Sequence, residues 1–201
     1  MFRRSLMLVA AAILIGAPSA GAANVLAKIR VEGFTRTIFG PTNPRVSATN
    51  ALDALTNAGK AGEFFVHVTD TSFGPYVDQV GYFAAFGSSG WTYKVNGVSP
   101  PVGADKVQLK DGDTVLWYYA DFGPAGGPPT LLLKKATTGK GCYTVVAQDD
   151  NGKTVTQANV LLQVGSKRTV KVAAGKACVG PHPGSLVRAT APGAVRSNAL
   201  A

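Results

Sequence analysis

The sequence has few of the side chains that carry acid–base chemistry. It contains two histidines and two cysteines among 201 residues. The histidines, His67 and His182, lie on opposite sides of a Pro/Gly-rich segment, and no spacing places a nucleophile on a strained turn beside either one. We therefore expect a protein that is not an enzyme. The enzymatic alternative is a triad of His67 with Asp70 and with Ser72 or Ser88, which predicts hydrolysis that is lost in His67→Ala.

Closely spaced carboxylates are also scarce. Asp111 with Asp113, and Asp149 with Asp150, are the pairs that could offer oxygen ligands. Neither pair supplies the six or more oxygens that calcium takes, and Asp beside Gly or Asn is typical of turns. No metal site and no cofactor site is expected from these residues.

Long apolar runs are missing as well. The run from Leu6 to Gly16 is shorter than the roughly 20 residues that span a bilayer. It follows Arg3 and Arg4 and precedes the small residues Ala20-Gly21-Ala22. This pattern is typical of a secretory signal peptide, residues 1–23, with a retained anchor as the alternative. We expect a secreted or extracytoplasmic protein without a transmembrane segment in the mature chain.

Aromatic and acidic side chains are rare after the Pro/Gly-rich segment 123–129. Beyond the signal peptide, Tyr143 is the only aromatic residue that follows it. Residues 24–127 hold eight Lys and Arg against nine Asp and Glu, whereas residues 128–201 hold ten against two. This change predicts two domains, 24–122 and 130–201, joined by the linker 123–129.

The first domain has an α+β pattern. Thr49 or Asn50 can cap a helix that carries Leu52 and Leu55 on one face, and Gly59 is the expected stop. Tight turns are expected at Asn96-Gly97 and Asp111-Gly112. The predicted strands are 25–31, 36–39, 63–69, 76–83, 91–96 and 114–119.

A series of turn and strand residues runs through the second half of the first domain: Gly90-Trp91, Tyr93, Val95-Asn96-Gly97, Gly103-Ala104, Leu109-Lys110-Asp111-Gly112-Asp113 and Trp117-Tyr118-Tyr119. This series resembles the transcobalamin-like C-terminal domain family of secreted bacterial proteins. The resemblance implies a β-grasp-like fold with one helix over roughly residues 24–119, and a corrinoid as a candidate ligand. This chain has no large helical region like the one that holds the corrin in vertebrate vitamin B12 carriers.

Alternation along the strands separates core from candidate site. Trp91, Tyr93 and Val95 share one face, as do Val115, Trp117 and Tyr119, and these residues are expected to pack on the helix. The opposite face and the loop 83–90 could together form an exposed apolar patch that binds a ligand. The alternative is that this patch packs against the second domain. The ligand candidates are Phe83, Phe86, Trp91, Leu116 and Tyr118.

The second domain is predicted to be a small antiparallel β-sandwich, because no stretch has an apolar period near 3.6 and 149–153 forms a good hairpin turn. It resembles immunoglobulin-like and carboxypeptidase-regulatory-like accessory domains. Cys142 and Cys178 both lie here, and export permits a disulfide, with two free thiols as the alternative. The predicted strands are 130–135, 143–148, 160–164, 169–172 and 186–191.

The basic second domain should attract polyanions, which outside a cell are anionic envelope polymers. Nucleic acid is not expected, because Tyr143 alone could stack on bases. The sequence thus predicts a secreted, non-catalytic binding protein that holds a small ligand or protein segment near the cell envelope. The alternative is a structural or adhesive surface module whose basic domain binds anionic envelope polymers.

Overall fold

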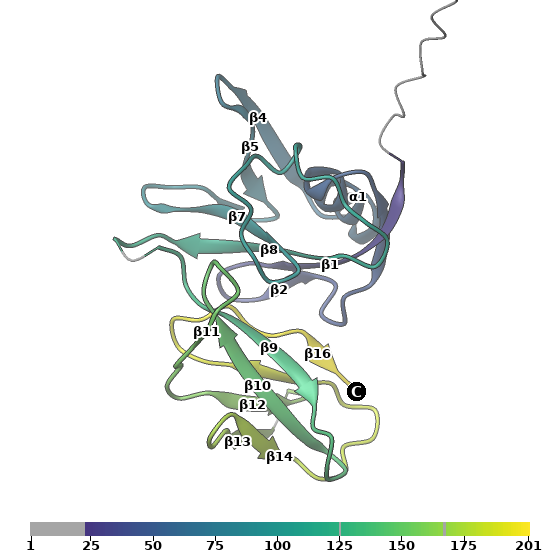
Figure 1. Ribbon diagram of the computed structural model, residues 1–201, viewed down its shortest axis with the longest axis vertical. Coiled ribbons are helices and arrows are strands. Elements are labelled where there is room, and N and C mark those ends of the chain that lie inside the picture. Colours follow the sequence, from purple (N-terminus) through teal and green to yellow (C-terminus); the bar gives the residue numbers. More distant parts are fainter. Residues whose placement is uncertain (1–22, 125, 167) are drawn as a thin grey trace, which may run out of the picture.

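The computed structural model describes residues 23–124, 126–166 and 168–201. In this part the chain is mostly β with one helix, and it forms two bodies along its long axis (Figure 1). We call residues 24–122 the first module and residues 130–201 the second module. The predicted signal peptide lies outside the described residues except for Ala23. No described helix is long and apolar enough to cross a membrane.

The first module is built on a five-stranded sheet in the order β2-β1-β8-β7, with β3 also paired to β1. β1 and β8 run parallel, with Lys28 opposite Thr114 and Glu32 opposite Tyr118. The other neighbours in this sheet are antiparallel. The strands are β1 (Val25–Glu32), β2 (Thr37–Phe39), β3 (Arg45–Ala48), β7 (Ser89–Val95) and β8 (Thr114–Asp121).

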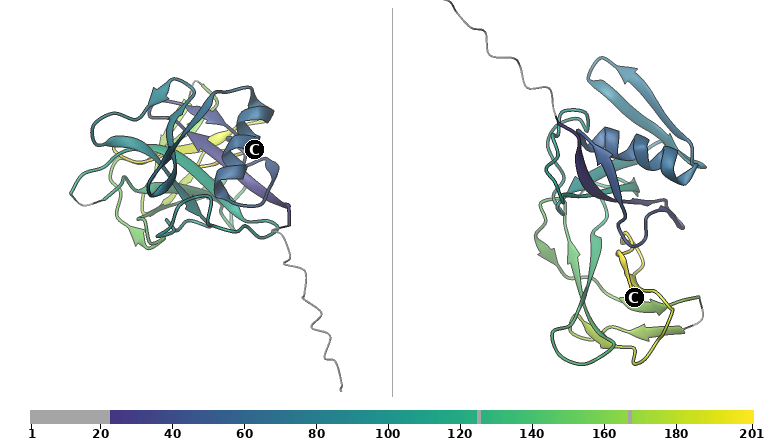
Figure 2. Two further views of the ribbon diagram at one scale, coloured as in Figure 1. Left: turned by 90° about the horizontal axis from the view of Figure 1, so that it is seen from above. Right: turned by 90° about the vertical axis from the view of Figure 1, so that its right-hand side faces the viewer.

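The helix α1 (Ala51–Gly62) packs on one face of this sheet (Figure 2). Asn50 caps it, because its side-chain oxygen accepts a hydrogen bond of 2.8 Å from the backbone N–H of Asp53. The prediction that Gly59 ends the helix is wrong, since the helix continues to a left-handed cap at Glu63 (φ 52°). Gly59 is needed for packing instead: a Cβ there would lie 2.9 Å from Cγ2 of Val66.

A second, three-stranded antiparallel sheet completes the first module. Its β4–β5 hairpin projects away from the second module (Figure 1). The strand expected over 76–83 is divided in two, because Gly81 takes a positive φ of 57° and turns the chain. The strands are β4 (Val66–Thr71), β5 (Gly74–Val80) and β6 (Phe83–Ala84).

Aromatic side chains fill the space between α1 and the five-stranded sheet, as the alternation predicts. Trp117 is buried, and its indole N–H donates a 2.9 Å hydrogen bond to the carbonyl of Ala51 at the start of the helix. The Tyr93 ring stacks on Trp117 with centroids 5.1 Å apart. Because Trp117 points toward α1, the even-numbered residues of β8 lie on the opposite face of the sheet, away from the helix.

The second module contains two four-stranded sheets that share one core. One has the order β11-β10-β14 with β9 also on β10, and the other has the order β13-β12-β15-β16. All the strand pairs within them are antiparallel. The arrangement is sandwich-like, because residues of both sheets contribute to the same core. The strands are β9 (Thr130–Lys135), β10 (Cys142–Gln148), β11 (Thr154–Val155), β12 (Leu161–Val164), β13 (Arg168–Lys171), β14 (Lys176–Cys178), β15 (Val187–Thr190) and β16 (Ala199–Leu200).

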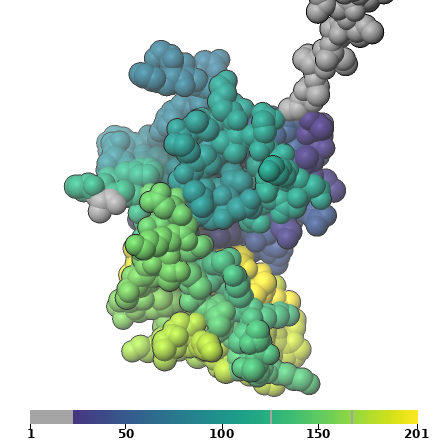
Figure 3. Space-filling view, viewed as in Figure 1, coloured from purple at the N-terminus to yellow at the C-terminus, as the bar shows by residue number. Residues whose placement is uncertain are grey.

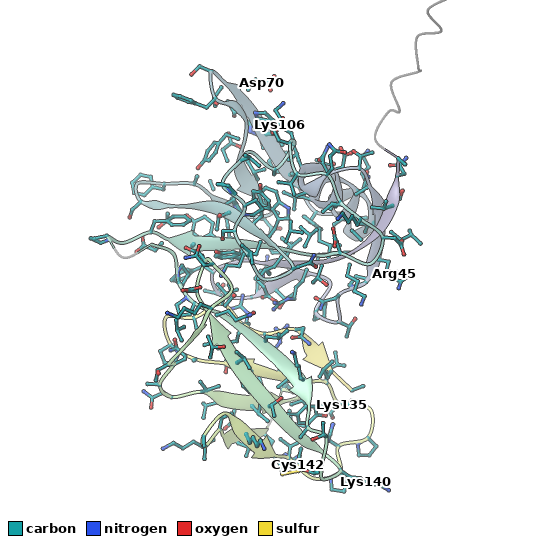
Figure 4. All side chains as sticks on the ribbon, in the orientation of Figure 1. Arg45, Asp70, Lys106, Lys135, Lys140 and Cys142 are labelled. Atoms are coloured by element: carbon teal, nitrogen blue, oxygen red, sulfur yellow. A yellow bond between two sulfur atoms is a disulfide. The ribbon has the colours of Figure 1, made fainter. Side chains whose placement is uncertain are left out.

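The predicted disulfide is confirmed. Cys142 on β10 lies directly opposite Cys178 on β14, and the two are bonded. The alternative of two free thiols is therefore wrong. Figure 4 places Cys142 at the end of the second module farthest from the first.

Candidate ligand-binding groove

The even-numbered residues of β8 face the second module. Leu116, Tyr118 and Ala120 form a small apolar cluster with Val195 of the second module. Tyr118 is fully buried there. This strand is thus one part of the contact between the modules, and Figure 3 shows their surfaces in contact.

A buried lysine crosses the contact beside Tyr118. The Lys94 ammonium has no exposed side-chain surface and donates to the carbonyl of Asp149 at 2.6 Å and to the hydroxyl of Thr130 at 3.2 Å. Its Nζ lies 3.4 Å from Oδ1 of Asp150, which also accepts a 3.2 Å hydrogen bond from the Tyr118 hydroxyl. Burial lowers the pKa of Lys94, and the Asp150 charge opposes that shift. Burial raises the pKa of Tyr118, and Asp150 adds to the effect.

A second polar contact is centred on Glu32, whose side chain is completely buried. Nε of Arg196 lies 3.0 Å from Oε2 of Glu32, and Arg188 and Arg30 lie within 3.6 Å of Oε1. Desolvation lowers the pKa of Arg30 to about 10, partly offset by Glu32. Because Glu32 belongs to the first module while Arg188 and Arg196 belong to the second, this cluster also holds the modules together.

A groove of about 700 Å³ opens between the modules at the carboxyl end of β8. The first module supplies the exposed ring of Phe34 and the half-buried ring of Tyr119, which meet edge to face with centroids 6.5 Å apart. The remaining wall comes largely from the second module. The lining residues are Gly33, Phe34, Thr35, Tyr119, Ala120, Asp121, Pro128, Asn159, Leu161, Gln163, Thr190, Ala191, Pro192, Gly193, Ala194, Val195 and Arg196.

The two charged side chains that line the groove, Arg196 and Asp121, make hydrogen bonds within the protein. Arg196 donates to the carbonyls of Gly33 and Phe34 as well as to Glu32, so it holds the loop that carries the Phe34 ring. Asp121 accepts a 2.7 Å hydrogen bond from the hydroxyl of Ser88. These bonds fix the walls of the groove, and Arg196 is also paired with the opposite charge of Glu32.

Four neutral polar side chains of the groove have hydrogen-bonding capacity left over. No side-chain hydrogen bond joins Thr35, Asn159, Gln163 or Thr190 to another residue of the described ranges. An amide offers two donors and an acceptor, and a hydroxyl offers a donor and acceptors. The groove therefore combines two aromatic surfaces with uncommitted neutral polar groups.

The structure does not bring the five predicted ligand candidates together. Leu116 and Tyr118 are buried at the module contact, and Trp91 is buried in the first module. Phe83 is half-buried, whereas Phe86 is 86% exposed on the loop before β7. The expectation that the patch is exposed as one surface is wrong, because β8 turns Leu116 and Tyr118 toward the second module. The alternative, packing against the second domain, holds for these two residues.

Sequence reasoning missed the groove residues Phe34, Tyr119 and Gln163. Phe34 lies in a short loop without periodicity, and Tyr119 was assigned to the core. Gln163 alternates with buried Leu162 and Val164 on β12, which could have marked it as outward-facing. Nothing in the sequence shows that these three residues line one groove.

The hypothetical triad is not assembled. Nδ1 of His67 lies 2.7 Å from Oδ1 of Asp78, a residue of the neighbouring strand, and not beside Asp70. The second oxygen of Asp78 accepts a 2.6 Å bond from Thr69. The Ser88 hydroxyl is bonded to Asp121. His67 is thus part of an exposed strand-to-strand contact.

These observations describe a β-rich two-module protein with a ligand-sized groove at the module contact. Residues 48–121, from the end of β3 to the end of β8, match the family described as "Domain of unknown function (DUF4430)", which is related to transcobalamin-like domains. The match covers less than half of the chain and leaves the second module outside. No curated protein matches the chain.

Proposed function

We propose that this chain is an extracytoplasmic, non-catalytic binding protein that holds a small ligand in the groove between its modules. The first module is of the β-grasp type in this proposal, supported by one helix packed on a mixed sheet whose β1 and β8 are parallel neighbours. The Cys142–Cys178 disulfide and the signal-like pattern of residues 1–23 support a place outside the cytoplasm.

The observation that carries the proposal is the set of free polar groups in a groove with rigid walls. Ligand sites of proteins are mostly hollows of roughly 300–1,000 Å³ with apolar walls and a few placed polar groups. The groove has about 700 Å³, aromatic surface from Phe34 and Tyr119, and the Gln163 amide, which bonds to no other side chain or backbone group of the described residues. Two ion-paired contacts between the modules keep these walls in place, which reduces the ordering cost of binding.

The chemistry of the walls favours an uncharged, polar ligand with one apolar face. The aromatic rings offer contact area, while Asn159, Gln163 and Thr190 offer donors and acceptors. A charged group would compete with the pairing of Arg196 to Glu32.

The groove lining offers no side chain to coordinate the cobalt of a corrinoid. No residue of the groove lining has an imidazole, thiol or thioether side chain that could coordinate cobalt. We therefore assign no corrinoid chemistry to the chain.

The test compares groove variants with a matched surface variant. Gln163→Leu removes the free amide, and Phe34→Ala removes the exposed ring. Phe73→Ala removes an aromatic ring that is fully exposed and is absent from the groove lining. Thermal-shift screening against glycans, peptides and corrinoids finds the ligand, and calorimetric titration then compares its affinity among the three variants.

We expect a loss of affinity of roughly 5- to 150-fold in Gln163→Leu and Phe34→Ala, because unpaired polar groups and lost ring contact each cost about 1–3 kcal/mol. Phe73→Ala should bind normally. Phe86→Ala separates this site from the exposed loop: loss of binding in Phe86→Ala with normal binding in the groove variants would overturn the proposal.

A second candidate function, a structural or adhesive surface module, is supported by the basic side chains of the second module. Lys134, Lys135, Lys140, Lys153 and Lys176 are all exposed. Figure 4 places Lys135 and Lys140 at or near the end away from the first module. This function predicts salt-sensitive retention on anionic cell-wall polymers that falls in a Lys135→Glu/Lys140→Glu variant. Equal retention by that variant and the parent would argue against it.

A further inference from the structure

A second hollow lies at the other end of the module contact. It has a volume of about 380 Å³ and borders Thr114 and Leu116, at the start of β8, whereas the groove borders the end of that strand. The buried Tyr118 lies between them in the sequence of β8. The lining residues are Arg30, Asn43, Asn96, Gly97, Thr114, Leu116, Thr130, Leu131, Leu132, Lys134, Gln148 and Asn198.

The charge of this hollow is of one sign. Arg30 and Lys134 are its only ionisable lining residues, and no carboxylate is among them. The nearby Glu32 carboxylate is shared among Arg30, Arg188 and Arg196, so it cannot neutralise all three guanidinium groups. The Asp113 carboxylate lies behind Asn96 and outside the lining, so the charges of the lining itself are positive.

Two buried polar atoms in the lining have no partner. Nε of Arg30 and Oδ1 of Asn43 are out of contact with solvent and make no hydrogen bond within the described part of the chain. Both hydrogen bonds of Arg30 are made by Nη1, to Glu32 and to the carbonyl of Arg196. Unsatisfied polar atoms in a protein interior are uncommon and call for an explanation. Here they belong to two residues that line the same hollow, where Arg30 Nε is a buried donor and Asn43 Oδ1 a buried acceptor.

The side-chain amides of Asn96 and Asn198, which also line the hollow, are held by hydrogen bonds within the protein. Asn96 donates to Asp113 and accepts from the backbone of Thr114, and Asn198 makes two bonds to the backbone of Leu133. These residues form fixed walls around Arg30, Asn43 and Lys134. Such a preorganised arrangement lowers the cost of binding a small group.

We propose that this hollow is a binding site for an oxyanion, the phosphate, sulfate or carboxylate group of a small molecule, held by Arg30 and Lys134, with the amide N–H group of Asn43 as a further donor. A planar guanidinium and an ammonium are the groups that bind oxyanions through charge-assisted hydrogen bonds. Arg30 stays charged at neutral pH, since its pKa of about 10 lies well above 7. The site is separate from the groove and does not depend on the ligand proposed there.

The chain offers a matched pair of variants on β9. Lys134 lines the hollow, whereas Lys135 is the next residue, is equally an exposed lysine and is absent from the lining. Lys134→Gln and Lys135→Gln remove the same charge from adjacent positions. General attraction of anions to the basic surface would respond equally to both changes.

The experiment titrates the full chain with inorganic phosphate, sulfate and acetate at constant ionic strength, with sodium chloride as the balancing salt. We expect saturable binding of at least one oxyanion and a rise in melting temperature beyond that in chloride. Lys134→Gln should weaken binding about tenfold, and Lys135→Gln should leave it unchanged. Comparison of the three anions identifies the group, and Gln163→Leu, a groove variant, should retain the same oxyanion affinity.

A third variant tests the interior of the hollow. Asn43 has a left-handed backbone (φ 55°), which aspartate tolerates, so Asn43→Asp is expected to fold. Its carboxylate would add a negative charge to the lining of the hollow and should abolish oxyanion binding. Equal weakening by Lys134→Gln and Lys135→Gln, or the absence of saturable binding by all three anions, would overturn the proposal.

Discussion

Lys94 of the first module lies 3.4 Å from Asp150 of the second, with the lysine side chain fully buried and the aspartate partly exposed. The Tyr118 ring lies beside the same ammonium, 5.9 Å from its nitrogen. A single lysine therefore connects the sheet of the first module to the β10–β11 turn of the second.

Lys94→Met is expected to lower the free energy of unfolding by about 2–3 kcal/mol. The change leaves the carbonyl of Asp149 and the Asp150 carboxylate without their donor, although solvent around Asp150 reduces the cost below that of a fully buried pair. Lys106→Met is the control, since Lys106 pairs with Asp105 on an exposed surface and should cost less than about 1 kcal/mol. Urea unfolding measures both; equal effects would refute the buried contact.

Glu32→Gln is expected to cost about 3–5 kcal/mol, because it removes the one carboxylate that faces Arg30, Arg188 and Arg196. The loss should also separate the modules, which proteolysis in the segment 123–129 would report. Glu63→Gln changes an exposed glutamate in the same way and should be near neutral. A stability of Glu32→Gln within 1 kcal/mol of the parent would contradict this account.

Replacing Cys142 and Cys178 together by serine should destabilise the second module by about 3–4 kcal/mol, because the bond closes a loop with a sequence separation of 36. The first module has no cysteine and should retain its near-ultraviolet tryptophan signal until higher denaturant. Mass spectrometry without reductant provides the direct check: a mass about 2 Da above that of the oxidised chain would show that the bond is absent.

The raised pKa of Tyr93 predicts that the free energy of unfolding falls at alkaline pH. Burial, aided by the charge of Asp105, raises its pKa to about 12 in the folded chain, while the unfolded value is about 10. Between these values the unfolded chain loses a proton that the folded chain keeps, so the free energy of unfolding falls as pH rises. Burial lowers the pKa of Lys94, which acts in the opposite direction, so the measurement is the difference between the parent and Tyr93→Phe from pH 9 to 12. A difference that stays constant would refute the assignment.

Substitutions at the two ends of α1 are expected to change the free energy of unfolding in opposite directions. Asn50→Ala removes the side-chain cap on the Asp53 N–H and should cost about 1 kcal/mol. Glu63→Gly relieves a left-handed residue at the other end and should stabilise the chain by up to about 1 kcal/mol. Thermal unfolding of both variants checks the pair. Destabilisation by Glu63→Gly would mean that the left-handed cap is not the dominant cost there.

Local patterns in the sequence predict much of the fold. Alternation around Trp117 identifies a core face, Asn50 marks the start of the helix, and the two cysteines predict their bond. Short elements escape such reasoning, because a four-residue strand such as β3 has too few residues to show a period. Gly59 shows a different limit, since a close approach by Val66 explains this glycine better than a helix end does.

The candidate groove depends on how the two modules meet, which local patterns do not contain. Alternation places Tyr118 on the outer face of its sheet correctly, yet only the structure shows that Asp150 and Val195 cover it. The same contact brings Phe34 and Gln163, far apart in the sequence, to one groove. Their pairing would require knowledge of the docking geometry.

The parallel pairing of β1 with β8 has a mechanical consequence. A pull on the chain at Val25 and at the segment after Asp121 would act on opposite ends of two adjacent strands. The hydrogen bonds between them would then be loaded together in shear rather than opened one after another. A domain strained in this direction resists extension far better than one whose strands are peeled apart.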